Sequence, residues 1–196
     1  MLKRSLFLVF SVLAINNLLK ETELEIFDIE KLTTHGGSNR IFIKKIRSNK
    51  KVTDNVSKII NEELSFGMDK FETYQKFAQN VINSKNETKK IFIELKKNNA
   101  KIIGYGATYK SSTILNYCGL DTKFIDYFTD TTETKQGKFT PGTHIPILKP
   151  TDGINSEVNY AFLGAGNFKK EIFNKEKKFI ERGGKFITHV PFPKII

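Results

Sequence analysis

The chain has 196 residues but a single cysteine and no long run of apolar residues. Because Cys118 stands alone, the sequence excludes an internal disulfide and a zinc site built from several of its own cysteines. The longest apolar segment, at residues 5–15, is far shorter than the roughly 20 residues that a membrane-spanning helix needs. We therefore expect a cytoplasmic protein without a membrane partner.

Recognisable catalytic motifs are also lacking. The sequence contains no Gly-x-Ser-x-Gly nucleophile elbow, no metal-ligand spacing and no glycine-rich loop near the N-terminus that would hold a large cofactor. These absences predict no metal site within the chain. From the residues alone, they favour an α/β binding module over a complete enzyme.

Positive charge, by contrast, is abundant. The 32 lysines and arginines outnumber the 21 acidic residues and give a net charge of +11. The lysines are scattered among Asn, Ile and Phe along the whole chain, which favours a solvated lysine-rich surface over a nucleic-acid-binding face. Small anionic ligands, above all phosphates, are compatible with this charge.

The N-terminal segment is compatible with either an export signal or a packed helix. Residues 3–15 combine a basic pair with an apolar run, as a secretory signal does, but no small-x-small cleavage site follows. Apolar residues recur instead at helical spacing, at Leu8, Val12, Ile15 and Leu19. This spacing favours an amphipathic helix that buries one stripe and ends near Lys20.

The rest of the chain predicts a strand pair, two helices and then alternating elements. Residues 24–32 and 39–46 are rich in β-branched and aromatic residues and flank a glycine turn, while 53–65 and 69–97 have helical periodicity. Two strand–helix–strand units follow, at 100–107, 109–119 and 123–128, and at 158–165, 167–184 and 185–190. Such repetition predicts a parallel sheet with helices on its faces.

The turn "GYGATYKSS", residues 104–112, is the strongest candidate for a binding site. It follows a predicted strand and opens a helix, so backbone N–H groups at the carboxyl end of the sheet can meet an anion. The third glycine of the dinucleotide fingerprint is absent, and no Walker-type Gly-Lys-Ser/Thr follows. The spacing leaves both a phosphate site and an ordinary tight turn open.

Two further segments carry candidate side chains. The loop 129–150 is long and rich in Gly, Pro and Thr, and its Lys135, Lys138 and His144 would reach the same sheet edge as the glycine turn. Each of these is otherwise an ordinary surface lysine or packed histidine. His35, followed by two glycines, is a candidate acid/base or hydrogen-bonding group, or a turn histidine without a ligand.

Four strings together resemble a known family: "THGGSNR", "GYGATYKSSTILNYCG", "DTTETKQGKFTPGTHIPI" and "GGKFITHVPFP". In this order they resemble the C-terminal half of the sugar C-methyltransferases, over residues 10–193. Those enzymes use S-adenosylmethionine to methylate a carbon of nucleotide-linked 4-keto deoxysugars. The resemblance implies an α/β fold, with a Rossmann-like parallel sheet and flanking helices, preceded by a helix and two strands left from an adjoining catalytic domain.

On this resemblance, residues 1–47 are the trailing piece of the methyl-transfer domain and residues 48–196 form a nucleotide-sugar-binding domain. S-adenosylmethionine and zinc are cofactors of the full-length family, and we expect this chain to bind neither. The family's catalytic Glu-His pair aligns with Ser5 and Leu6, which cannot act as a general base. Lys110-Ser111-Ser112-Thr113 and Gly166-Asn167 also depart from the family pattern. We therefore expect no catalytic residue and no activity of the chain alone.

The substrate-binding residues implied by the resemblance are His35, Gly36, Gly37, Ser38, Gly104, Tyr105, Gly106, Ala107, Lys110, Lys135, Gly137, Pro141, Gly142 and His144. They predict a site for a keto-deoxysugar linked to a nucleotide, with thymidine diphosphate (dTDP) as the expected carrier. An alternative is a non-catalytic accessory module that works with a separately encoded methyltransferase half. A weaker alternative is a gene remnant without a ligand.

Overall fold

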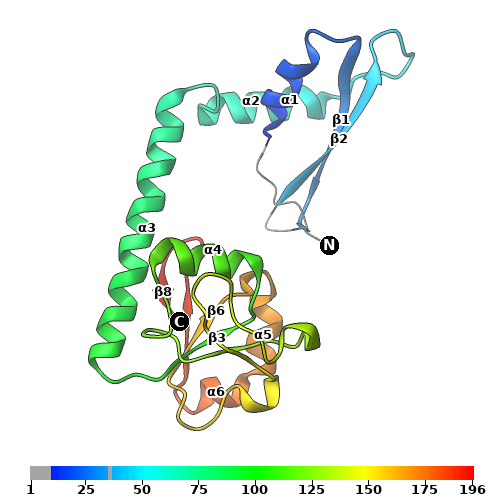
Figure 1. Ribbon diagram of the computed structural model, residues 1–196. Coiled ribbons are helices and arrows are strands. Elements are labelled where there is room, and N and C mark those ends of the chain that lie inside the picture. The colour runs from blue at the N-terminus through cyan, green and yellow to red at the C-terminus, as the bar shows by residue number, and fades with distance from the viewer. Residues whose placement is uncertain (1–9, 35–36) are drawn as a thin grey trace. The chain divides into compact units, whose positions relative to one another are not determined.

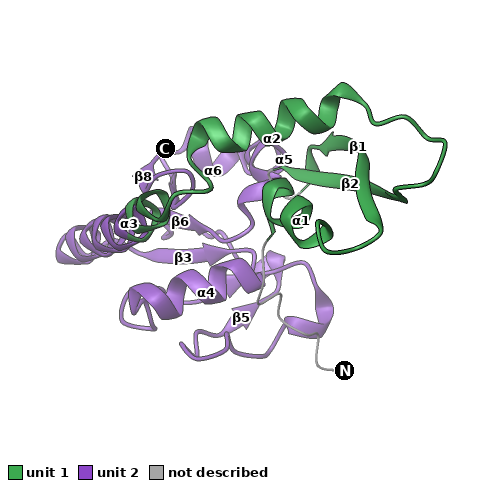
Figure 2. Ribbon diagram, turned by 90° about the horizontal axis from the view of Figure 1, so that it is seen from above, with its two compact units in different colours: residues 1–78 green, residues 79–196 purple. Residues whose placement is uncertain are grey.

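The computed structural model describes residues 10–34 and 37–196. The chain divides into two compact units, 1–78 and 79–196 (Figure 2). The long helix α3 (Phe71–Lys97) crosses this division. The domain boundary expected between residues 47 and 48 refers to the origin of the two parts in the family, and it stays a prediction.

The first unit is a small helix-and-hairpin structure. It contains α1 (Val12–Leu19), β1 (Leu24–Leu32), β2 (Ser38–Lys45) and α2 (Asp54–Phe66), and the two strands pair antiparallel. The apolar side chains of all four elements share one core, in which Val12, Ile26, Ile29, Val56 and Ile59 are buried. The predicted N-terminal helix and strand pair are therefore confirmed within the described residues.

The second unit is built on a six-stranded sheet (Figure 1). Its strands are β3 (Ile102–Tyr105), β4 (Phe128–Thr129), β5 (Ile147–Leu148), β6 (Tyr160–Leu163), β7 (Lys185–Thr188) and β8 (Lys194–Ile195), in the order β5-β4-β3-β6-β7-β8. All neighbouring pairs are parallel except β7 with β8. The connecting helices are α4 (Tyr109–Cys118), α5 (Lys169–Lys175) and α6 (Lys177–Glu181), with short 3₁₀ turns at Glu133–Lys135, Pro150–Asp152 and Gly166–Phe168. The predicted α/β class with a mainly parallel sheet is confirmed.

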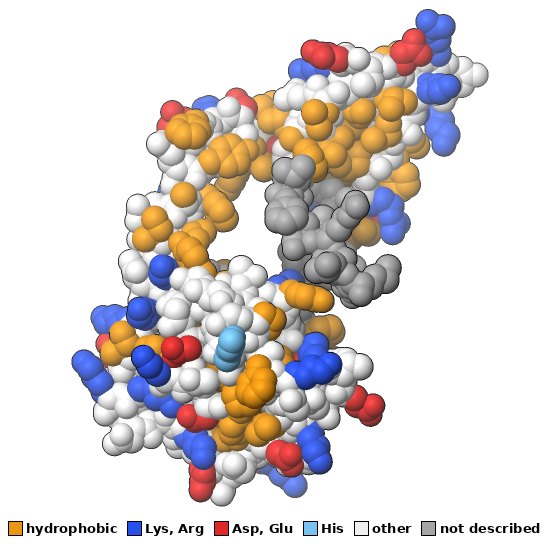
Figure 3. Space-filling view, viewed as in Figure 1, with side chains coloured by type: hydrophobic (Ala, Val, Ile, Leu, Met, Phe, Trp, Pro, Cys, Tyr) orange, Lys and Arg blue, Asp and Glu red, His pale blue; other side chains and the backbone are white. Residues whose placement is uncertain are grey.

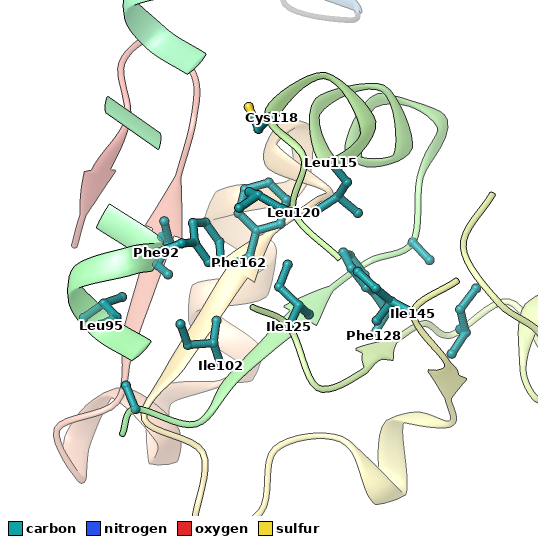
Figure 4. Close-up of a cluster of buried hydrophobic side chains, with 14 residues drawn as sticks. Phe92, Leu95, Ile102, Leu115, Cys118, Leu120, Ile125, Phe128, Ile145 and Phe162 are labelled. Atoms are coloured by element: carbon teal, nitrogen blue, oxygen red, sulfur yellow. The ribbon is translucent and has the colours of Figure 1, made fainter. Parts of the chain in front are cut away.

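Side chains alternate between the two faces of this sheet, because successive residues of a strand point to opposite sides. Ile102, Phe162 and Ile187 join the cluster that also holds Phe92 of α3 and Leu115 of α4 (Figure 4). The neighbouring residues Ile103, Leu163 and Phe186 join the opposite cluster, with Ile172 of α5 and Phe179 of α6. Each face is thus covered by helices, as a parallel sheet requires.

The strand order reverses between β3 and β6. The chain runs from β3 to β4 and then β5 in one direction, and returns to place β6 on the other side of β3. In open α/β sheets, ligands bind outside the carboxyl ends of the strands at such a switch point. The ends of β3 and β6 therefore mark where to look for a site.

Two details differ from the expected elements. The helix predicted at 167–184 is broken at Glu176, and the break lets both Phe173 and Phe179 pack on Phe186, at ring-centroid distances of 4.9 and 5.4 Å. Residues six apart do not share a face of a continuous helix. The strand predicted at 123–128 is shorter, and β5 and β8 were not predicted.

In the described part of the chain, no helix is long and apolar enough to cross a membrane. On the face shown in Figure 3, lysine and arginine side chains are dispersed among acidic and apolar ones over both units. The net positive charge is thus spread over this face.

Candidate functional site

A cleft of about 390 Å³ opens at the switch point, and we call it the switch cleft. Its lining from the β3–β4 side includes Tyr105, Gly106, Thr108, residues 129–132 and Lys135, and its lining from the β6 side includes Ala165, Phe168, Glu171 and Lys175. Every one of these residues belongs to the unit 79–196. The volume is in the range of small-molecule sites.

The glycine turn after β3 is pressed against the turn after β6. Gly106 has φ of +81°, and a Cβ built on it would lie 2.7 Å from Cβ of Ala165. Only glycine combines that backbone angle with so close an approach. The hydroxyl of Thr108 donates a hydrogen bond of 2.8 Å to the carbonyl of Gly164, which joins the two turns.

The amides of the turn have partners within the protein. Gly106 N–H donates to the carbonyl of Thr129, at 2.8 Å. Ala107 N–H donates to Oδ2 of Asp130, at 2.8 Å, and Thr108 N–H donates to the hydroxyl of Ser111, at 2.9 Å. The sequence predicted a phosphate at this turn, but the amide of Ala107 binds the carboxylate of Asp130 in its place.

Asp130 is the central charged group of the switch cleft. Its side chain stands directly after β4, the residue is 7% exposed, and Oδ1 accepts from Thr132 N–H at 2.8 Å while Oδ2 also accepts from Nζ of Lys135 at 3.1 Å. Burial would raise the pKa of this carboxyl, but the hydrogen bonds from Thr132 and Lys135 and the charge of Lys135 together lower it. Asp130 is therefore held ionised.

Lys135 is tied into the same network. Its Nζ donates to Oδ2 of Asp130 and, at 2.8 Å, to the carbonyl of Ala107. Two of its three N–H donors are thus used within the protein. The charge of Lys135 is balanced by Asp130, so this lysine is a weaker phosphate ligand than the sequence suggests.

A second hollow of about 220 Å³ adjoins the switch cleft, and we call it the lysine pocket. It shares Thr108 and Lys135 with the switch cleft, and Tyr109, Lys138 and Phe139 are among its other lining residues. Tyr109 and Phe139 are largely exposed, at 79% and 63%. Exposed aromatic rings beside lysines can stack on a nucleotide base and meet its phosphates.

The N-terminus of α4 borders the lysine pocket. Thr108 caps the helix by accepting from Ser111 N–H at 3.1 Å. Within the described residues, the amides of Tyr109 and Lys110 have no protein acceptor. The helix thus adds two outward N–H donors at its positive end.

Several predicted site residues lie at or beside these hollows. Gly106, Ala107, Lys135 and Pro141 line one hollow or both, and Tyr105 lines the switch cleft. The hydroxyl of Tyr105, however, donates to Oε1 of Glu176 at 2.7 Å, and burial together with this partner raises the pKa of Tyr105. Its hydroxyl is thus committed to a partner within the protein.

Other predicted residues shape the backbone around the hollows and do not line them. Gly104 faces the ring of Phe128, which leaves no room for a Cβ, and Gly142 likewise faces Asn116. Gly137 and His144 adopt positive φ angles of +73° and +54° in the loop after β4, where His144 is exposed. Lys110 is exposed on α4.

The remaining predicted residues belong to the other unit. Gly37, with φ of +122°, and Ser38 lie at the start of β2. His35 and Gly36, together with Ser5 and Leu6 at the position of the family's catalytic pair, lie outside the described residues. Their roles stay predictions.

Sequence reasoning missed Asp130 and Thr108. Asp130 is the first polar side chain after the second strand of the unit and lies 23 residues after Ala107, near the spacing at which nucleotide-binding folds carry a ribose-binding acid. Thr108 precedes a helix and is followed three residues later by Ser111, which is the pattern of a capping residue. Both signals are present in the sequence.

Comparison with known proteins identifies the family. A model of the C-methyltransferase C-terminal domain matches residues 33–191. The C-methyltransferase NovU of Streptomyces niveus is 33% identical over 190 residues. This chain belongs to the C-methyltransferase C-terminal domain family. The match covers 97% of this chain and 45% of NovU, so this C-methyltransferase homologue spans less than half the length of its relative.

S-adenosylmethionine is the methyl donor that the C-methyltransferase family implies, and the glycine turn is where a Rossmann-like fold would hold it. The described residues there do not fit it. The amides of Gly106, Ala107 and Thr108 donate to Thr129, Asp130 and Ser111, so the turn itself leaves no amide for the carboxylate of this cofactor. Among the described residues, no group of three or more His, Cys, Asp or Glu could hold a metal ion.

Proposed function

We propose that this C-methyltransferase C-terminal domain binds a keto-deoxysugar linked to a nucleotide, with dTDP as the carrier. The observation that carries the proposal is the pair of adjoining hollows at the carboxyl end of the sheet, which share Thr108 and Lys135. Two adjoining hollows suit a ligand with two dissimilar ends. The threonines and charged side chains of the switch cleft suit the hydroxyls of a sugar, and the aromatic rings and lysines of the lysine pocket suit a nucleotide.

The lysine pocket supplies groups for both parts of a nucleotide. Lys138 has no ion-pair partner among the described residues, whereas Lys135 is paired with Asp130. Tyr109 and Phe139 expose aromatic rings, and stacking on such rings contributes about 1–3 kcal/mol per base. A thymine base and its diphosphate would therefore meet both an aromatic and a cationic surface.

We further propose that the chain binds this ligand without methylating it. The amides of Gly106, Ala107 and Thr108 are bonded within the protein, and Ser5 and Leu6 align with the family's catalytic pair. Neither a hydroxyl nor an alkyl side chain can remove the proton beside a keto group at neutral pH. Methyl transfer would then require groups from a methyl-transfer half.

Titration calorimetry tests the proposal directly. The purified chain is titrated with dTDP-glucose and, separately, with S-adenosylmethionine, and we expect heat from the first and none from the second. Lys138→Ala should weaken dTDP-glucose binding by about tenfold, because a charge-assisted contact is lost. Lys123→Ala removes a lysine from the loop between α4 and β4, at the amino end of the strands, and should change nothing. Tight binding of S-adenosylmethionine, or equal effects of both variants, contradicts the proposal.

A further inference from the structure

The two hollows differ in the net charge of the side chains that line them. The described lining of the switch cleft contains Asp130 and Glu171 as well as Lys135 and Lys175, so acids and bases are equal in number. The described lining of the lysine pocket contains Lys135 and Lys138 and no acidic residue. An anion entering from solvent therefore meets an attractive surface on one side of the glycine turn only.

Asp130 is the acidic residue of the switch cleft that lies at the glycine turn itself. Its carboxylate accepts hydrogen bonds from Ala107 N–H at 2.8 Å and from Thr132 N–H at 2.8 Å, and it holds the ammonium of Lys135 at 3.1 Å. These are donors that would otherwise face a phosphate at the end of a β-strand. With Asp130 in place, a phosphate at the same turn would face a buried negative charge and a neutralised lysine.

We propose that Asp130 is a specificity-determining residue, which admits the uncharged, hydroxyl-bearing end of the ligand to the switch cleft and leaves the diphosphate to the lysine pocket. The inference rests on the proposed function and fixes the orientation of the ligand. An ionised carboxylate has about four acceptor positions, and three of those on Asp130 are used by the protein. The remaining position faces the side-chain hydroxyl of Thr132. A sugar hydroxyl can take the place of that donor, whereas a fully ionised phosphate has no proton to donate. Thr131 and Thr132 line the same cleft and add hydroxyls of their own.

The test compares Asp130→Asn with wild type and with Asp126→Asn. Asp126 precedes β4 and pairs with Lys96, so its substitution removes one negative charge from the same segment at the other end of the strand. Each protein is titrated with inorganic pyrophosphate, with dTDP and with dTDP-glucose. Pyrophosphate reports the affinity for an anion, and the ratio of the two nucleotide affinities reports the contribution of the sugar.

We expect Asp130→Asn to bind pyrophosphate about tenfold more tightly than wild type, because the repulsive charge is lost and Lys135 is released. The preference for dTDP-glucose over dTDP should fall about fivefold in the same variant, since an acceptor for hydroxyls is lost. Asp126→Asn should behave as wild type in both respects. An unchanged ratio and pyrophosphate affinity in Asp130→Asn, or an equal gain in Asp126→Asn, overturns the inference.

The titrations separate a failure of the proposed function from a failure of the role inferred for Asp130. If wild type binds neither nucleotide, the proposed function fails, while the pyrophosphate comparison still decides the role of Asp130. Circular dichroism checks that the variants fold. A second experiment uses only the wild-type chain bound to dTDP-glucose, so it does not depend on the folding of any variant. Nuclear Overhauser contacts from the glucosyl protons should reach the amides of Thr131 and Thr132, and contacts to Lys138 in their place would overturn the inference.

Discussion

The hydroxyl of Thr108 donates a 2.8 Å hydrogen bond to the carbonyl of Gly164, 56 residues further along the chain. The same oxygen accepts from Ser111 N–H at 3.1 Å and thereby caps α4. One side chain thus both begins a helix and joins the turns that follow β3 and β6. The floor of the switch cleft depends on this junction.

Thr108→Ala should therefore destabilise the unit 79–196. Loss of a helix cap costs about 0.5–2 kcal/mol and loss of a further hydrogen bond about 1 kcal/mol, so we expect a decrease of about 1–3 kcal/mol in the free energy of unfolding. The control is Thr113→Ala on the exposed side of α4, whose hydroxyl donates to Tyr109 within the same helix. Urea denaturation followed by circular dichroism measures both, and equal losses would contradict the double role of Thr108.

Gly106→Ala tests the close approach of the two turns. A Cβ at this position meets Cβ of Ala165 at 2.7 Å, in addition to the strain of a φ of +81°. Gly137→Ala is the matched control, because Gly137 has a similar φ of +73° but no atom within 4 Å of the added carbon. We expect Gly106→Ala to lower the free energy of unfolding, measured by urea denaturation, by about 1–3 kcal/mol more than Gly137→Ala does. Similar midpoints would show that the turns can move apart.

Glu63 offers an independent test in the first unit. Its carboxylate on α2 accepts from the backbone N–H groups of Val12 and Leu13, at 2.9 and 2.6 Å, and so holds the N-terminus of α1. Glu63→Ala should cost about 1–2 kcal/mol, as the loss of a charged cap does. The neighbouring Glu62 pairs with Lys31 at the surface, where solvent screens the pair, and Glu62→Ala should cost clearly less than Glu63→Ala. Thermal or urea unfolding that ranks the two variants in the opposite order would contradict this assignment.

His189 should make stability depend on pH. Burial lowers the pKa of its imidazole, and Nδ1 has no hydrogen-bond partner in the described part of the chain. Because the folded state favours the neutral ring, its contribution is present above the unfolded pKa of about 6.5 and is lost as pH falls through that value towards the folded pKa. Wild type should therefore lose stability between about pH 7.5 and pH 5.5.

His189→Phe is the variant that isolates this effect, since it keeps an aromatic ring beside Phe162, where the centroids lie 5.3 Å apart. The loss of stability between the two pH values should be smaller in His189→Phe than in wild type. His144→Gln, at an exposed site, should retain the wild-type loss. A wild-type loss that persists in His189→Phe would show that another group is responsible.

The sequence predicted most of the elements in their observed order, and it pointed to the sheet edge at which the structure has its two hollows. That this edge binds a ligand stays a prediction. Periodicity predicted α4 because this helix buries one regular stripe, and a short continuous apolar run predicted β6, which is buried on both faces. It failed where tertiary contacts decide: the break at Glu176 serves the packing of Phe173 and Phe179 on Phe186, and the two-residue strand β5 exists only by pairing with β4.

The contacts of the predicted site residues were harder to predict than their place at the sheet edge. The lysine at 135 and the glycine turn were both identified, but as ligands of a phosphate. The structure pairs Lys135 with Asp130 and gives the amide of Ala107 to the same carboxylate. The carboxylate of Asp130 thus occupies the place expected for a phosphate. This depends on the contact between the ends of β3 and β4, which no local sequence pattern encodes.

The most direct test of the central claim is a titration of the isotopically labelled chain with dTDP-glucose, followed by backbone amide chemical shifts. Perturbations should be confined to the two hollows, at residues 105–112, 129–150 and 165–175. A useful internal control is the hollow lined by Ser156, Arg182 and Lys185 at the amino end of the strands, which should not respond. Absence of any perturbation, or perturbations centred on Arg182, would contradict the account.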